Sequence, residues 1–134
     1  METSTELREL TLSLYKSQEK GDSSYIERLM TRQNGSLIIG SDPDEWWTGY
    51  ENIVKELRSQ DGIFVGSSLT GDPQAYVRGD VGWVADHLEI VFSDGTEIFA
   101  RSTMVFEKEA GEWKIVLWHF SVGIPNVDAG FGDV

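Results

Sequence analysis

The pattern of hydrophobic and polar positions changes near residue 63. Before that point, apolar residues recur three or four positions apart, as in Leu7, Leu10 and Leu14, which is typical of amphipathic helices. After it, apolar and polar residues alternate, which is typical of strands with one buried face. The pattern predicts helices over residues 3–20, 22–30 and 48–61, and strands over residues 36–40, 63–70, 74–78, 81–92, 96–108 and 112–122.

This order of elements predicts one α+β domain. Helices that precede a run of antiparallel strands are expected to pack on one face of the sheet. The strands over 81–92 and 96–108 are longer than most, and long strands twist, so the sheet should curve around the helices and leave a hollow. Residues 1–134 are therefore expected to form a single domain, with an irregular tail over 123–134 where glycine is frequent.

The composition of the chain argues against several classes of partner and chemistry. Its 134 residues include 11 Lys and Arg against 23 Asp and Glu, a net charge of −12, which repels nucleic-acid phosphates and anionic membranes. The absence of cysteine excludes thiolate metal ligands and a cysteine nucleophile, and the two histidines form no paired metal motif. The acidic N-terminus does not resemble a signal peptide, so a cytoplasmic location is expected.

Several short segments, taken in order, resemble one known family. They are Leu-Ile-Ile-Gly at 37–40, Trp-Thr-Gly-Tyr-Glu at 47–51, and the segments 101–103, 111–115 and 119–123. Together they are similar to nuclear transport factor 2-like domains of the SnoaL-like type, over a core of about residues 6–125. The resemblance implies a cone-shaped antiparallel sheet packed on three helices, a deep pocket at the wide end and often a dimer through the sheet. Family members include isomerases, dehydratases, cyclases and noncatalytic binding domains, so function has to be argued from the site.

The last strand carries apolar side chains on both faces. Strict alternation places Trp113, His119 and Ser121 on one face, and Trp118 and Phe120 on the other. The resemblance implies that the first face is the interior, which directs His119 and Ser121 into the pocket. Because histidine titrates near neutral pH, His119 is a candidate general acid or base, although a buried histidine that only hydrogen-bonds the scaffold fits equally well. The second face then predicts a homodimer through Trp118 and Phe120.

Two charged residues fall on the central strands. Asp86 is the one ionisable residue on the more apolar face of the 81–92 strand, where a raised pKa would suit acid–base chemistry; a salt bridge or a turn contact is the simpler interpretation. A bulge would reverse the faces and bring Trp83 and His87 inside instead. On the returning strand, Arg101 either holds a substrate carboxylate or pairs with Asp86 or Glu97, because an unpaired arginine in mid-strand is costly.

The loop over residues 41–47 is placed by the resemblance at the mouth of the pocket. Isomerases of this family use an Asp-Pro dipeptide near this position as a base, and Asp42-Pro43 matches it; a turn with capping acids is the simpler interpretation. The same enzymes place an oxyanion-donating tyrosine on the first helix, and Tyr15 lies one residue away from that position. Trp46 and Trp47 either line an apolar ligand site, contact a second subunit or close the end of the core.

The leading hypothesis from the sequence is a protein that binds an apolar or aromatic small molecule between Trp46, Trp47, Trp83 and the last strand. His119, with Asp86 or Asp42, would supply the acid–base chemistry of an isomerase, a dehydratase or a cyclase, and such reactions require no cofactor. The alternative is a noncatalytic dimeric domain of the same shape that binds a ligand or another protein.

Overall fold

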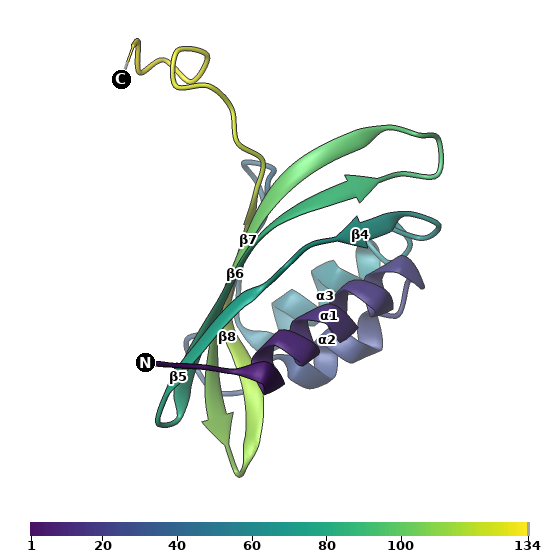
Figure 1. The fold of residues 1–134 in the computed structure, drawn as a ribbon. Coiled ribbons are helices and arrows are strands. Elements are labelled where there is room, and N and C mark those ends of the chain that lie inside the picture. Colours follow the sequence, from purple (N-terminus) through teal and green to yellow (C-terminus); the bar gives the residue numbers. More distant parts are fainter. Residues whose placement is uncertain (134) are drawn as a thin grey trace.

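A computed structural model describes residues 1–133 and shows three helices packed against one face of a curved sheet (Figure 1). The helices are α1 (Thr5–Glu19), α2 (Ser23–Leu29) and α3 (Tyr50–Ser59). The strands are β1 (Glu2–Thr3), β2 (Leu37–Ile39), β3 (Trp46–Thr48), β4 (Ser68–Thr70), β5 (Gln74–Arg78), β6 (Val81–Val91), β7 (Glu97–Glu109) and β8 (Glu112–Ser121). The predicted α+β class is confirmed, although β1 precedes α1, and β2 and β3 lie between α2 and α3.

The sheet is open and mixed, where the sequence predicted an antiparallel one. Its strands follow the order β1-β5-β6-β7-β8-β2-β3, and β4 pairs with β6 beyond the end of β5. The long strands β6, β7 and β8 form an antiparallel meander. The chain returns from α2 to place β2 beside β8 in the same direction, so this one strand pair is parallel. The alternation of apolar and polar residues predicts a strand, but it does not show whether that strand pairs in a parallel or an antiparallel direction.

Besides Glu2–Thr3, which forms β1 beside β5 although the first helix was predicted from residue 3, two segments differ from the predicted secondary structure. Residues 61–66 form turns, so the expected strand over 63–70 is reduced to β4. The expected loop over 41–47 ends instead in β3, which pairs antiparallel with β2. Both segments are short, and their conformation depends on strand partners that are distant in the sequence.

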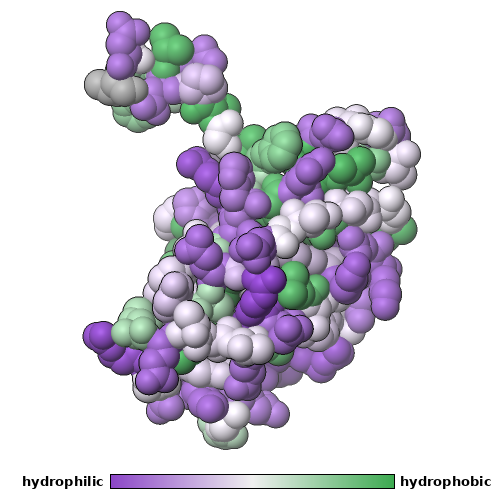
Figure 2. Space-filling view, viewed as in Figure 1, coloured by the Kyte–Doolittle hydropathy of each residue, from purple (hydrophilic) through white to green (hydrophobic). Residues whose placement is uncertain are grey.

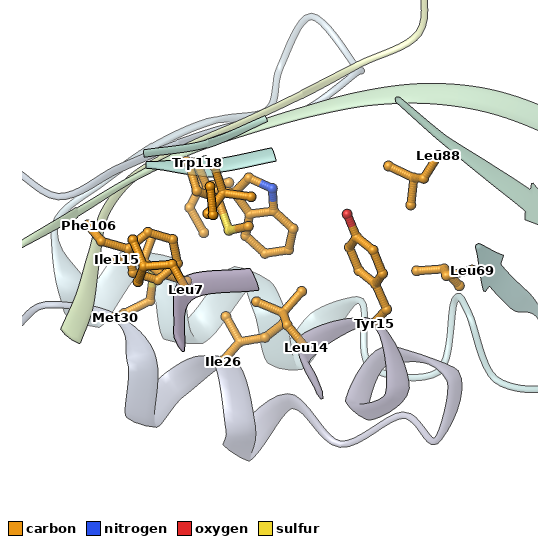
Figure 3. Close-up of a cluster of buried hydrophobic side chains, with 14 of the residues drawn as sticks. Leu7, Leu14, Tyr15, Ile26, Met30, Leu69, Leu88, Phe106, Ile115 and Trp118 are labelled. Atoms are coloured by element: carbon orange, nitrogen blue, oxygen red, sulfur yellow. The ribbon is translucent and has the colours of Figure 1, made fainter. Parts of the chain in front are cut away.

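The core lies between the helices and the inner face of the sheet (Figure 3). Leu7 and Leu14 of α1 are fully buried in one cluster with Met104 and Phe106 of β7 and with Ile115 of β8. Burial of each such side chain stabilises the fold by about 1.5–3 kcal/mol. The helical stripe predicted for the first helix is therefore the surface that holds α1 on the sheet.

A β-bulge in β8 reverses the faces of the strand halfway along its length. Val105 of β7 pairs with Leu117, whereas the next residue, Phe106, pairs with Ile115, so Val116 has no partner in β7. One extra residue in a strand moves every later side chain to the opposite face. Ile115 therefore faces the interior before the bulge, and Trp118 faces it afterwards.

The C-terminal segment after β8 stands away from the body of the domain (Figures 1 and 2). A turn begins at Pro125, whose carbonyl accepts hydrogen bonds from the N–H groups of Asp128 and Ala129. Ile124 and Phe131 are strongly exposed. Residues 123–133 form no helix or strand, and residue 134 of the predicted tail lies outside the described residues. Among the helices of residues 1–133, none has the length and apolar character that crossing a membrane requires.

Candidate functional site

An apolar cavity of about 270 Å³ opens at the end of the molecule where α1 and α3 terminate. Gln18 of α1, Gln60 after α3 and side chains of the four strands β2, β3, β7 and β8 surround it. We call it the aromatic cavity, because its walls include Trp47, Phe64, Phe92, Trp118 and Phe120. The rings of Phe64 and Phe92 stack with their centroids 6.1 Å apart. The cavity is large enough for a compact organic molecule of one or two rings.

One carboxylate, that of Glu45, lies in this apolar wall. Within the described chain, Glu45 is the only ionisable residue that lines the aromatic cavity. Its Oε1 accepts a hydrogen bond from the backbone N–H of Asp42 at 2.8 Å, and its Oε2 accepts one from Nε2 of Gln60 at 2.8 Å. Gly40 allows this approach, since a Cβ atom at that position would lie 2.6 Å from Oε1 of Glu45. The loop is therefore built around the Glu45 side chain.

Asp42 does not line the aromatic cavity. It is exposed, and its Oδ1 accepts a hydrogen bond from the backbone N–H of Asp44 at 2.9 Å, which closes a turn. The turn interpretation of Asp42-Pro43 therefore describes the structure, and the expected pocket-lining position of Asp42 is wrong. The carboxylate at the cavity comes three residues later, from Glu45. Its position next to two tryptophans was a signal that the sequence interpretation missed.

The two adjacent tryptophans point to opposite faces of the sheet. Trp47 is 8% exposed and lines the aromatic cavity, whereas Trp46 is 62% exposed on the outer face. They belong to β3, where Trp47 pairs with Ile38 and Trp46 pairs with Ile39, so their side chains alternate. Of the two predicted ligand contacts, the structure brings only Trp47 to the cavity.

The bulge in β8 also overturns the predicted faces of the last strand. Beyond Val116, Trp118 and Phe120 line the aromatic cavity, while His119 is exposed on the outer face and Ser121 follows it there. His119 and Ser121 therefore do not point into the cavity, and Trp118 and Phe120 are not available to a partner subunit. The indole N–H of Trp118 donates a buried hydrogen bond to Oγ of Ser102 at 2.9 Å, which fixes its ring in the interior.

The faces of β6 follow the predicted alternation without a bulge. Its even-numbered residues, including Val84 and Leu88, are buried, and Asp86 lies on this inner face. Trp83 and His87 lie on the outer face, where Trp83 stacks on Tyr76 with 5.0 Å between the ring centroids. Trp83 is therefore remote from the aromatic cavity, and the expectation that it contacts a ligand there is wrong.

Tyr15 and Asp86, considered separately in the sequence, meet in the structure. The phenol of Tyr15 donates a hydrogen bond to Oδ2 of Asp86 at 2.5 Å, and Figure 3 shows its hydroxyl pointing toward the sheet. Oδ1 of Asp86 accepts from the backbone N–H groups of Asp72, at 3.1 Å, and His87, at 2.8 Å. Burial, reinforced by the hydrogen bond to Asp86, raises the pKa of Tyr15 far above its ordinary value. Neither side chain lines the aromatic cavity, so the pair joins α1 to β6 and to the loop before β5.

Arg101 lies on the outer face of β7, where it lines a shallow groove with His87 and Thr103. Across residues 1–133 it forms no ion pair with Asp86 or Glu97, so neither predicted pairing occurs. It lies on the opposite face from the aromatic cavity and does not line it. Nor does the part of the chain that the structure describes hold a group of three or more His, Asp or Glu residues placed to bind a metal ion.

A wider groove of about 780 Å³ runs between α1, α2 and the β7–β8 hairpin. Four acidic and four basic side chains line it, so their charges balance in number, and two ion pairs join four of them: Arg58 with Glu27 at 2.6 Å and Lys114 with Glu112 at 3.6 Å. These groups leave little unbalanced charge for a ligand. The aromatic cavity, with its largely apolar wall and one carboxylate, is the better candidate site.

Comparisons with known proteins agree with this architecture. A model of the SnoaL-like domain family matches residues 7–125. No curated protein matches the chain.

Solved structures share the fold at low sequence identity. An NTF2-like protein of unknown function from Pseudomonas putida KT2440 is 14% identical, with a TM-score of 0.80 over 90% of this chain and 87% of that one. A putative ketosteroid isomerase from Parabacteroides distasonis ATCC 8503 is 18% identical, with a TM-score of 0.75 over 93% of this chain and 96% of that one. A putative calcium/calmodulin-dependent protein kinase type II association domain from Thiobacillus denitrificans ATCC 25259 is also 18% identical, with a TM-score of 0.73 over 86% and 93% of the two chains. Such identities establish the fold alone, but the family match spans most of the chain, and the protein belongs to the family of SnoaL-like domains, within the NTF2-like fold.

Proposed function

We propose that the protein binds an apolar or aromatic small molecule in the aromatic cavity. The observation that carries this proposal is the composition of the wall, in which Trp47, Trp118 and Phe120 surround a space of about 270 Å³ that contains one carboxylate. Small-molecule sites are typically apolar concavities with a few fixed polar groups. Two of the structural neighbours, a putative ketosteroid isomerase and a putative kinase association domain, have different names on the same fold, so the fold alone does not indicate a function and the cavity wall is what supports the proposal.

The chemistry that this cavity supports is proton transfer. Glu45 can remove a proton from a bound molecule and return it elsewhere, which is the requirement of isomerisation or dehydration without a cofactor. His119, Asp86 and Asp42 were the candidates from the sequence, but none of them lines the cavity. The amides of Gln18 and Gln60, which do line it, are available to orient the ligand. In this proposal Glu45 is the acid–base residue.

A pair of neighbouring substitutions tests ligand binding at this site. Phe120→Glu places a carboxylate in the cavity wall, and His119→Glu adds the same charge to the outer face of the same strand. We expect the wild-type protein to bind the neutral fluorescent probe N-phenyl-1-naphthylamine. Phe120→Glu should weaken binding at least tenfold, because a charge beside an apolar ligand must lose water, and His119→Glu should leave it unchanged. Fluorescence titration measures both, and a wild-type protein that does not bind the probe would refute the proposal.

We further propose that a second copy of the chain covers the outer face of the sheet. The helices cover the opposite face (Figure 1), and this one exposes Trp46 to 62% and Phe99 to 57%. Exposed aromatic side chains on an uncovered sheet favour a protein interface. This outer-face dimer replaces the predicted dimer through Trp118 and Phe120, which face the interior.

Sizing chromatography with light scattering tests this dimer. Trp46→Glu should convert a wild-type dimer into monomers, because it places a charge in the interface on each copy. Ile63→Glu is the matched control, since Ile63 is 55% exposed but lines the aromatic cavity. It should leave the dimer intact. A monomeric wild-type protein at micromolar concentration, or a dimer that survives Trp46→Glu, would refute the interface.

A further inference from the structure

The aromatic cavity carries a negative charge that the chain does not neutralise. Glu45 forms no ion pair within residues 1–133, and no Lys, Arg or His of that range lines the cavity. The N–H of Asp42 and the amide of Gln60, which donate hydrogen bonds to Glu45, are both uncharged. The whole chain adds to this field, with a net charge of −12. A ligand that enters the cavity therefore meets a carboxylate without a counter-ion.

The carboxylate of Glu45 retains the capacity to bind a ligand. An ionised carboxylate offers about four acceptor positions, and the two hydrogen bonds from Asp42 and Gln60 occupy two of them, one on each oxygen. These two bonds also fix the orientation of the carboxylate at the cavity wall, so a ligand donor does not have to order it. A positively charged donor forms a stronger hydrogen bond to such a group than a neutral donor does.

The aromatic walls favour the same charge. The faces of tryptophan and phenylalanine rings carry partial negative charge and attract cations, most strongly where water is excluded. Trp47 and Trp118 both line the cavity, with most of each side chain packed against the protein, at 8% and 6% exposure. An anionic ligand would have to lose its water next to these rings and next to Glu45, with no cation in the wall to compensate.

We propose that the aromatic cavity selects molecules with an apolar or aromatic body and one protonated amine, and that Glu45 is the residue that recognises the amine. This selectivity rests on the proposed function, since it requires that the cavity binds small molecules. It adds the charge class of the ligand. Anionic metabolites such as carboxylates and phosphate esters are excluded by the same carboxylate.

Three ligands of one shape test the charge class. They are 2-naphthylmethylamine, 2-naphthalenemethanol and 2-naphthoate, which at neutral pH are a cation, a neutral molecule and an anion. Isothermal titration calorimetry with the full chain should show the amine bound about tenfold more tightly than the alcohol, and the naphthoate bound most weakly. Equal affinities for the amine and the alcohol, or preference for the naphthoate, would overturn the selectivity while the proposed cavity stands. No binding by any of the three would overturn both.

A matched pair of variants assigns the preference to Glu45. Glu45→Gln removes the charge in the cavity, and Asp42→Asn removes the same charge three residues away, on an exposed turn. We expect Glu45→Gln to abolish the preference for the amine, with the affinity for the alcohol changed less than about threefold, which shows that the cavity is intact. Asp42→Asn should keep the preference. In case the glutamine side chain of Glu45→Gln disturbs the loop, Glu45→Ala is a second test, and it should abolish the preference for the amine as well. If the preference for the amine survives in Glu45→Gln and Glu45→Ala, or disappears in Asp42→Asn, the amine is attracted by surface charge and the assignment to Glu45 is overturned.

Discussion

Trp118→Ala is expected to lower the free energy of unfolding by about 3–5 kcal/mol, the range for removal of a large aromatic side chain from a core. Trp118 is 6% exposed and belongs to the buried cluster between the helices and the sheet (Figure 3). Its loss enlarges the aromatic cavity and removes the partner of the buried Ser102 hydroxyl. Urea denaturation followed by circular dichroism measures the change.

His119→Ala is the matched control for this prediction, because it alters the next residue of the same strand. His119 is exposed on the outer face, so its loss should change stability by no more than about 0.5 kcal/mol. The two results together test the bulge at Val116. In a strand without the bulge, His119 would be buried and Trp118 exposed, and the order of the two effects would be reversed.

The bulge also shows why the last strand was misread from the sequence. Ile115 and Trp118 face the interior, but Val116 and Leu117 between them are apolar as well. Apolar side chains are therefore buried whether or not the strand has a bulge, and the alternation of residues does not indicate the extra residue, Val116. The register is decided by the pairing with Val105 and Phe106 of β7, a contact that only the assembled sheet makes.

Local signals were sufficient for most of the fold. The stripe of Leu7 and Leu14 predicted α1 and its buried face, and the alternation in β6 placed Asp86 inward and His87 outward, as the structure has them. Those predictions depend on periods that a single segment contains. The parallel pairing of β2 with β8 depends on two segments about 80 positions apart in the sequence, and so it could not be predicted in this way.

The candidate site was harder to predict than the fold, because distant residues assemble it. The turn at Asp42 was visible in the sequence, but the carboxylate that reaches the aromatic cavity is that of Glu45. Its position requires Gly40, which leaves room beside it, and Gln60, which donates to it from the end of α3. Tertiary contacts therefore determine that Glu45, and not Asp42, lines the aromatic cavity.

Asp86→Ala is expected to lower the free energy of unfolding by about 2–4 kcal/mol, although it removes only one partly buried side chain. The carboxylate of Asp86 accepts hydrogen bonds from the phenol of Tyr15 and from the N–H groups of Asp72 and His87. Tyr15 is 3% exposed, so its hydroxyl would lose its partner without gaining free access to water. On its edge away from β7, β6 has no strand partner between its pairings with β5 and β4, so no strand on that side replaces these contacts.

A double-mutant cycle separates the phenol from the other contacts of Asp86. Tyr15→Phe removes the hydroxyl and keeps both backbone hydrogen bonds, so it should cost about 1–2 kcal/mol. In that background, Asp86→Ala should cost less than it does alone, by a coupling energy of about 0.5–3 kcal/mol. Glu89→Ala, on the outer face of the same strand, is the control and should have little effect.

The sign of the Asp86→Ala result distinguishes two roles for this pair. A structural carboxylate is stabilising, because its hydrogen bonds offset the loss of hydration on burial. Residues that serve chemistry are often held at a cost to stability, and their replacement then leaves stability unchanged or increases it. We predict that Asp86→Ala lowers stability, as for a structural carboxylate. Asp86 accepts three hydrogen bonds, and neither Tyr15 nor Asp86 lines the aromatic cavity. An Asp86→Ala variant that matches or exceeds the wild type in urea would instead mark the pair as functional and move the reactive centre away from Glu45.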